Sequence, residues 1–256
     1  MRRVSWVLVT LLLCDSAFAT TIVAIIDRDN HAITVASDSL QRRGTKSERR
    51  CKIIEIPNCV VAMAGMYDKP YPPFHLETLI RDACSQPGDL RYKANVFATS
   101  ASSPVGTLIQ YLHDSEPTYY AEEVNSAKGD FIDVLFLGIQ DGYLSIIAWG
   151  FRVENGVVRA ISDEITDHGP KDAIMFAGGA NDHIIAYAKD HKNWEHMGYV
   201  PAARRFVQIE IQAHPKIVGP PISVFQIDWL GRGIWIDRGA CGDGGKPPHK
   251  DKKHQH

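Results

Sequence analysis

Four residues near the start of the chain have types and spacings that suit the hydrolysis of an amide bond. They are Thr20, Asp38, Lys52 and Gly65. If the chain is cut after Ala19, Thr20 carries both a hydroxyl nucleophile and a free α-amine, and an amine can act as the base for that hydroxyl. The unperturbed pKa of such an amine is about 7.7–8.0, so near neutral pH it can accept the hydroxyl proton.

The other three residues would support this nucleophile. The Lys52 ammonium would favour the neutral amine and stabilise a developing alkoxide, while Asp38 would keep Lys52 charged and oriented. The Gly65 N–H would bind the oxyanion of a tetrahedral intermediate, and its missing Cβ would let a substrate approach. Singly, each residue also has a structural explanation, as a strand former, a solvated strand end or a turn. Their occurrence together favours the catalytic interpretation.

The first 19 residues have the pattern of an export signal. Arg2 and Arg3 precede an apolar run over 4–14, and a small-residue A-x-A end closes it at Ala19. The run is shorter than the roughly 20 residues that span a bilayer. We therefore expect cleavage after Ala19, a periplasmic or secreted protein, and no membrane association afterwards. A lipoprotein signal ending at Cys14 is the alternative; Leu13 argues against it because a small residue belongs there.

The composition is that of an ordinary globular domain. The chain has 256 residues, of which 45% are hydrophobic and 23% charged, and its net charge is −2. This charge gives no reason to expect a nucleic-acid partner. We predict a signal over 1–19, one domain over 20–240, and a disordered tail over 241–256 that is rich in Gly, Pro, Lys and His.

Four cysteines remain once the signal is removed: Cys51, Cys59, Cys84 and Cys241. In an oxidising compartment they allow two disulfides in three connectivities, and buried unpaired thiols are an equally compatible alternative. No cysteine or histidine pair has the spacing of a zinc site, so we expect no metal and no cofactor.

The elements that must position the four residues are two consecutive hairpins. Apolar, β-branched runs predict strands over 22–26, 32–38, 52–56 and 59–65. We expect these strands to form one antiparallel sheet. The end of the second strand, the start of the third and the end of the fourth would then meet at one edge, beside Thr20.

The rest of the chain alternates between helical and strand patterns. Helices are predicted over 76–84, about 104–112, about 182–188 and 202–213, and strands over 134–139, 144–151, 157–161, 173–176, 222–227 and 234–236. Because each sheet must bury an apolar face, we predict an α+β fold in which two antiparallel sheets pack together and helices flank them, a four-layer αββα sandwich.

Four segments together resemble a family. Residues 20–23, 35–39, 51–56 and 63–65, with Asp68 behind them, are similar to a proteasome β-subunit or its bacterial ring-protease relative. These are N-terminal nucleophile hydrolases of the threonine type. The resemblance implies the αββα fold, Thr20 as nucleophile and base, Asp38 and Lys52 as its supporting pair, and the Gly65 N–H as oxyanion donor.

The resemblance also implies further site residues and partners. Asp228 would be a second supporting aspartate, Met63 would line the substrate pocket, and Thr21, Met66 and Gly178 would also contact a peptide or small-amide substrate. The relatives form stacked rings, while other hydrolases of this class do not, so a homo-oligomer, as a ring or a dimer, is left open.

Two departures from the family keep other interpretations open. Ala177 and Gly231 stand where family members usually have serines. A non-catalytic scaffold or binding protein that keeps the fold is therefore one alternative to a threonine peptidase. An amidase of small non-peptide substrates is a second. A third is an unrelated secreted β-rich binding domain.

Overall fold

The computed structural model describes residues 20–43, 46–57, 59–125, 131–154, 156–169, 174–191 and 193–242. The expected signal over 1–19 and nearly all of the expected tail lie outside these ranges. The described chain mixes helices with antiparallel sheets, which confirms the α+β class.

The first sheet has five antiparallel strands in the order β12-β1-β2-β13-β14. Their bounds are Thr21–Asp27 for β1, Ala32–Ser37 for β2, Met175–Gly179 for β12, Ser223–Asp228 for β13 and Gly233–Asp237 for β14. Every residue of β1 is buried. Its near-continuous apolar sequence follows from this, since both faces of the strand are covered.

The second sheet also has five antiparallel strands, in the order β11-β10-β9-β6-β5. Their bounds are Ile53–Ile56 for β5, Cys59–Gly65 for β6, Ile132–Gln140 for β9, Tyr143–Glu154 for β10 and Val157–Thr166 for β11. The prediction that the first two hairpins share one sheet is therefore wrong. The β1–β2 hairpin belongs to the first sheet, and the β5–β6 hairpin belongs to the second.

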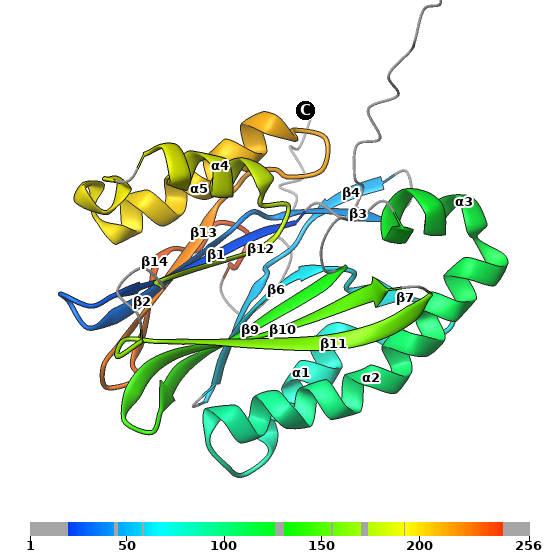
Figure 1. Ribbon diagram of the computed structural model, residues 1–256, viewed down its shortest axis with the longest axis horizontal. Coiled ribbons are helices and arrows are strands. Elements are labelled where there is room, and N and C mark those ends of the chain that lie inside the picture. Colours follow the sequence, from blue (N-terminus) through cyan, green and yellow to red (C-terminus); the bar gives the residue numbers. More distant parts are fainter. Residues whose placement is uncertain are drawn as a thin grey trace, which may run out of the picture.

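Helices cover the outer face of each sheet, and the two sheets face one another (Figure 1). Helices α1 (Leu76–Ser85) and α2 (Leu90–Ser115) share a core with the second sheet. Helices α4 (Asp182–Asp190) and α5 (Tyr199–Ala213) share one with the first sheet. A middle core joins the sheets and includes Ile22, Ala64 and Leu135.

Helix α2 begins much earlier than its predicted start near Pro104. Asp89 caps it by accepting a hydrogen bond from the Tyr92 N–H at 2.7 Å, and Pro104 lies inside the helix. The small residues between 94 and 103 gave a weak apolar signal, yet Ala94, Phe97 and Ala101 are fully buried. Tertiary packing thus extends the helix beyond what its local pattern predicts.

Short elements fill the connections between the sheets and helices. They are β3 (Leu40–Arg43), β4 (Lys46–Arg49), β7 (Asp68–Lys69), β8 (Phe74–His75), the helix α3 (Pro117–Tyr119), the π-helix η1 (Tyr120–Asn125) and the 3₁₀-helix η2 (Trp194–Met197). Strands β3 and β4 pair with each other as an antiparallel hairpin in the charged segment between β2 and β5.

Two disulfides connect the four cysteines, Cys51 with Cys241 and Cys59 with Cys84. Cys241, the first residue of the expected tail, is buried and is joined to the domain by its disulfide with Cys51. Disulfides of this kind are typical of oxidising compartments. Among the described residues, no helix has the length and apolar character needed to cross a membrane.

Candidate functional site

The Asp38 carboxylate lies at the centre of the candidate site. Its Oδ1 accepts hydrogen bonds from Lys52 Nζ at 2.6 Å and from the Thr21 N–H at 2.9 Å. Its Oδ2 accepts hydrogen bonds from the backbone N–H groups of Leu40 at 3.0 Å and Gly219 at 3.1 Å. Asp38 itself is fully buried, and its two oxygens are held by four donors that come from different parts of the chain.

Lys52 reaches Asp38 from the other sheet. It directly precedes β5, its side chain is fully buried, and Nζ also donates to the Leu40 carbonyl at 2.7 Å. Burial lowers the pKa of Lys52, and the charge and hydrogen bond of Asp38 oppose that shift. A buried charge needs such partners to be stable. The expected Asp38–Lys52 pair is present, although it spans the two sheets instead of lying at one sheet edge.

Thr20 directly precedes β1 and is held by its backbone. Its carbonyl accepts a hydrogen bond from the Ala180 N–H at 2.9 Å, and only 5% of the residue is exposed. The Thr21 hydroxyl donates to the Ala180 carbonyl at 2.9 Å. The Thr21 N–H and Lys52 Nζ donate to the same oxygen of Asp38. Because Thr20 is bonded to Thr21, the backbone of Thr20 lies close to both Asp38 and Lys52.

Two small residues make this close approach feasible. A Cβ placed on Gly179 would lie 1.8 Å from the Thr20 carbonyl oxygen and 3.1 Å from the Ala64 Cβ. Gly179 of the first sheet and Ala64 of the second therefore lie beside Thr20. By strand alternation, Thr20 faces the same side as Ile22, which belongs to the middle core. The candidate nucleophile thus lies at the edge of the layer between the sheets.

Gly65 ends β6, one residue beyond Ala64. Its φ is +93°, and a Cβ there would lie 2.0 Å from the Phe131 carbonyl oxygen. The backbone therefore requires glycine at this position, for both its left-handed conformation and its contact with Phe131. Gly65 directly follows Ala64, which lies beside Gly179. Its expected role, the donation of its N–H to an oxyanion at Thr20, stays a prediction.

A buried aspartate that the sequence analysis did not select completes the site. Asp133 of β9 is 5% exposed, and its Oδ2 accepts a hydrogen bond from the Gly179 N–H at 2.7 Å. It lies opposite Ala64 in the β6–β9 register. The sequence signal that could have identified Asp133 is a single carboxylate in an otherwise apolar strand. An aspartate is seldom buried without a specific partner, so its position in such a strand indicates a specific contact.

Gly178 has a packing role in place of the predicted substrate-binding one. It is buried, and a Cβ there would lie 3.0 Å from the Asp133 Cβ. Thr21, the other predicted contact on this sheet, is fully buried and binds Ala180 through its hydroxyl. In this structure both residues connect parts of the protein to one another, and neither offers a surface to a substrate.

Met63 and Met66 do not line a pocket at Thr20, which corrects another prediction. Met63 is fully buried and Met66 is 6% exposed, and both belong to the core beneath α1 and α2. Successive side chains of a strand point to opposite faces. Ala62 and Ala64 face the middle core on the Thr20 side, and Met63 consequently faces the helices.

Asp228 lies at the wrong end of its strand to support Thr20. In the β13–β2 register, Ser223 pairs with Ser37 beside Asp38, and Asp228 pairs with Ala32 at the far end of the hairpin. Six residues of strand separate Thr21 from that end, which corresponds to about 20 Å. The assignment to Asp228 was made from the resemblance alone. In the antiparallel pairing with β2, the first residue of β13 lies beside Asp38 and the last residue, Asp228, lies at the far end.

Asp228 instead stabilises the turn before β14. It accepts hydrogen bonds from the backbone N–H groups of Leu230 and Arg232, both at 2.9 Å, and from Arg232 Nε at 2.7 Å. The hydrogen bond from the Arg232 side chain lowers the pKa of Asp228. Gly231, which stands where a serine was expected, belongs to this turn with a φ of +74°. Neither residue is part of the group around Thr20.

Ala177, the other departure from the family pattern, contacts a different layer. It is paired with Val23 in the β1–β12 register, and both pack in the core beneath α4 and α5. Its side chain is therefore on the opposite face from Gly178, which contacts Asp133. The methyl group contributes to the packing of the helices on the first sheet.

No known family model matches the chain, and no curated protein sequence matches it.

Proposed function

We propose that this protein is an N-terminal-threonine hydrolase that cleaves amide bonds, either in peptides or in small amides. The observation that carries the proposal is the single Asp38 Oδ1 atom that accepts from both Lys52 Nζ and the first peptide N–H after Thr20. The order helix layer, sheet, sheet, helix layer supports the finer assignment of the fold to the N-terminal nucleophile hydrolases.

Export would generate the nucleophile. Removal of residues 1–19 by a signal peptidase frees the Thr20 α-amine without self-cleavage, and places the domain in the periplasm or outside the cell. The two disulfides support such a compartment. The mature chain then retains an even set of cysteines, all of them paired.

The reaction follows from the free amine and the charged lysine. The Thr20 hydroxyl gives its proton to the α-amine as Oγ bonds to the amide carbon, and the Gly65 N–H stabilises the resulting oxyanion. The amine then passes the proton to the leaving nitrogen, the C–N bond breaks, and an ester on Oγ remains. Water attacks this ester with the same amine as base, releasing a carboxylic acid and restoring the hydroxyl.

Lys52 and Asp38 act as positioning and electrostatic groups in this scheme. The fixed ammonium favours the neutral form of the nearby amine, because a second positive charge there would be repelled. Asp38 keeps the ammonium in place and also holds the backbone that carries Thr20. Asp133 orients Gly179, whose close contact with the Thr20 carbonyl sets the position of the threonine.

A non-catalytic binding protein is the second candidate. The burial of both methionines supports it, since neither side chain is available to form the wall of a substrate pocket. A ring or dimer of this chain remains a proposal under either function.

The decisive experiment is to identify the first residue of the exported protein by mass spectrometry, and then to label it with a β-lactone that acylates terminal threonines. We expect the chain to begin at Thr20 and to gain one label there. Thr20→Ala should lose both the label and amide hydrolysis, whereas Thr107→Ala, an exposed threonine on α2, should retain them. A chain that begins at Thr20 but takes no label would leave the binding protein as the function.

A further inference from the structure

Two histidines and a glutamate meet where the start of α4 packs against the end of α5. His183 comes from the first turn of α4, Glu210 from the last turn of α5, and His214 from the residue that follows α5. One side-chain ligand atom from each of the three lies within 4.8 Å of the other two. Glu210 is fully buried, while the side chains of His183 and His214 are 51% and 27% exposed.

The two oxygens of Glu210 have different surroundings. Oε1 accepts hydrogen bonds from the backbone N–H groups of His183 at 2.8 Å and Ile184 at 3.0 Å, so it caps the start of α4. Oε2 is buried and has no hydrogen-bond partner among the described residues. Leaving a buried carboxylate oxygen without a hydrogen bond is unfavourable by about 1–3 kcal/mol or more, and the imidazoles of His183 and His214 are within ion-pair distance only. This oxygen is the one that points toward the imidazoles.

The spacing of these atoms suits a metal ion. Glu210 Oε2 lies 3.4 Å from His183 Nδ1 and 3.7 Å from His214 Nε2. In a tetrahedral zinc site with metal–ligand distances of about 2.0–2.2 Å, neighbouring ligand atoms are about 3.4 Å apart. The observed separations exceed those of good hydrogen bonds and are close to this value. The two imidazole rings lie edge to face with their centroids 5.0 Å apart.

We propose that His183, Glu210 and His214 bind a divalent transition-metal ion of the Zn²⁺ class. Two imidazoles and one carboxylate are donors that favour zinc and its neighbours over Mg²⁺ or Ca²⁺, which prefer sets of oxygen ligands. The ion would supply the missing partner of Glu210 Oε2. With three protein ligands and an exposed His183, a fourth position is left open to solvent.

The ion would connect two segments that also hold the candidate active site. Ala180, three residues before His183, binds both Thr20 and Thr21. Gly219, five residues after His214, donates to Asp38. Metal binding would therefore cross-link the segment that joins Ala180 to His183 with the segment that joins His214 to Gly219. The binding itself does not rest on the proposed hydrolase function and can be tested without any substrate.

The test uses the tag-free mature chain, with His249, His254 and His256 replaced by serine in every protein so that the tail cannot bind metal. Co²⁺ is titrated while the visible d–d absorption is recorded, and Zn²⁺ is added in thermal unfolding. We expect tetrahedral Co²⁺ bands and a Zn²⁺-dependent rise in Tm. His183→Ala and His214→Ala should each weaken Co²⁺ affinity at least tenfold and remove the rise in Tm.

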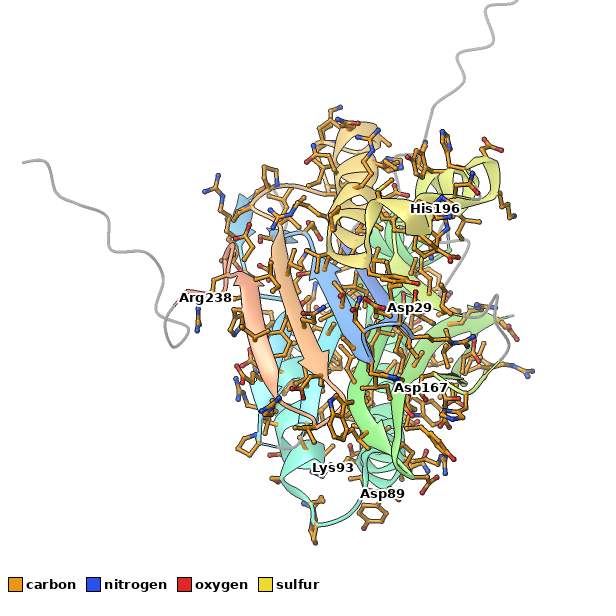
Figure 2. The ribbon with its side chains drawn as sticks, turned by 90° about the vertical axis from the view of Figure 1, so that its left-hand side faces the viewer. Asp29, Asp89, Lys93, Asp167, His196 and Arg238 are labelled. Carbon is orange, nitrogen blue, oxygen red and sulfur yellow. A yellow bond between two sulfur atoms is a disulfide. The ribbon has the colours of Figure 1, made fainter. Side chains whose placement is uncertain are left out.

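His196→Ala is the matched control, because His196 is an exposed histidine in the same helical layer (Figure 2). It should leave the bands and the Tm shift unchanged. If circular dichroism shows that a His→Ala variant is unfolded, His183→Gln or His214→Gln is used in its place. Absence of Co²⁺ bands in the parent protein, or equal affinity in all variants, would show that the three side chains are neighbours without binding a metal and would overturn the proposal.

Discussion

At the scale of single residues, the Asp38 carboxylate connects most of the candidate site. It binds a cation from one sheet, the start of β1, and two backbone N–H groups from the segments around Leu40 and Gly219. Loss of this one side chain would leave Lys52 as a buried, unpaired charge. Asp38 therefore has a structural role in addition to any part in catalysis.

The first prediction concerns this ion pair. Asp38→Asn should destabilise the fold by about 3–5 kcal/mol, because it leaves a buried ammonium without its counter-charge. Lys52→Met should also destabilise, and the double variant should lose less than the sum of the two single variants, since it removes both charges. Urea unfolding of the four proteins measures the coupling. Strict additivity would mean that the two side chains do not interact energetically.

The second prediction isolates the close contact at Gly65. Gly65→Ala should destabilise the protein by about 1–3 kcal/mol more than Gly142→Ala, the range found for overpacked sites. Both glycines have positive φ, +93° and +85° respectively, but a Cβ at Gly142 meets nothing within 4 Å. Thermal or urea unfolding of the two variants gives the loss of unfolding free energy in each. The difference between the losses reports the contact with Phe131, because both variants share the strain of a positive φ. Equal losses would argue that the strain alone requires glycine.

At the scale of elements, the two opening hairpins are divided between the sheets, and long-range contacts hold them together. Lys52, just before β5, binds Asp38, just after β2. The neighbouring Cys51 forms a disulfide with Cys241, which follows the last strand. The start of β5 is thus tied both to the first hairpin and to the C-terminal end of the described domain.

The third prediction compares the two disulfides. The Cys51–Cys241 bond closes a loop with a sequence separation of 190, and the Cys59–Cys84 bond one of 25. If chain entropy dominates, the first stabilises by about 5 kcal/mol and the second by about 3.5 kcal/mol. The double variant Cys51→Ala/Cys241→Ala should therefore lose more unfolding free energy than the double variant Cys59→Ala/Cys84→Ala.

The m value provides an independent readout for the disulfide variants, because Cys59, Cys84 and Cys241 are buried and removal of either disulfide also leaves a cavity in the folded state. Opening the longer loop lets the unfolded chain expand further, so the m value of urea unfolding should rise more for Cys51→Ala/Cys241→Ala. A larger increase in the other double variant would contradict the entropic explanation.

At the scale of the whole molecule, the two helix layers stabilise the sheets from outside, and the middle core sets how the sheets face each other. Phe225 of β13 is fully buried in this middle core and packs against Trp235, with ring centroids 4.8 Å apart. The candidate site lies at the edge of the same layer, so the packing of the two sheets also determines the distance from Lys52 to Asp38.

The fourth prediction tests the contribution of the middle core. Phe225→Ala should destabilise the protein by about 3–5 kcal/mol, as expected for a large cavity in a core. Ile234→Ala, on the neighbouring strand, removes a side chain that is 59% exposed and should change stability by no more than about 0.5 kcal/mol. Chemical unfolding followed by tryptophan fluorescence measures both. Similar effects for the two would mean that the interface between the sheets is only loosely packed.

Local sequence patterns were enough to predict the type of most elements and the residues at the centre of the candidate site. Strand alternation, the 3–4 spacing of apolar residues and the turn residues are local patterns, and they located strands, helices and the ends at which Thr20, Asp38, Lys52 and Gly65 lie.

Which residues share a face or an edge depended on how the elements pack in three dimensions. This packing divided the two hairpins between sheets, turned Met63 toward the helices, placed Asp228 at the far end of β13, and brought Asp133 to Gly179. It also assembled His183 with Glu210 and His214. These outcomes depend on strand order, register and helix packing, which are set by contacts between residues far apart in the chain and leave no local pattern to read.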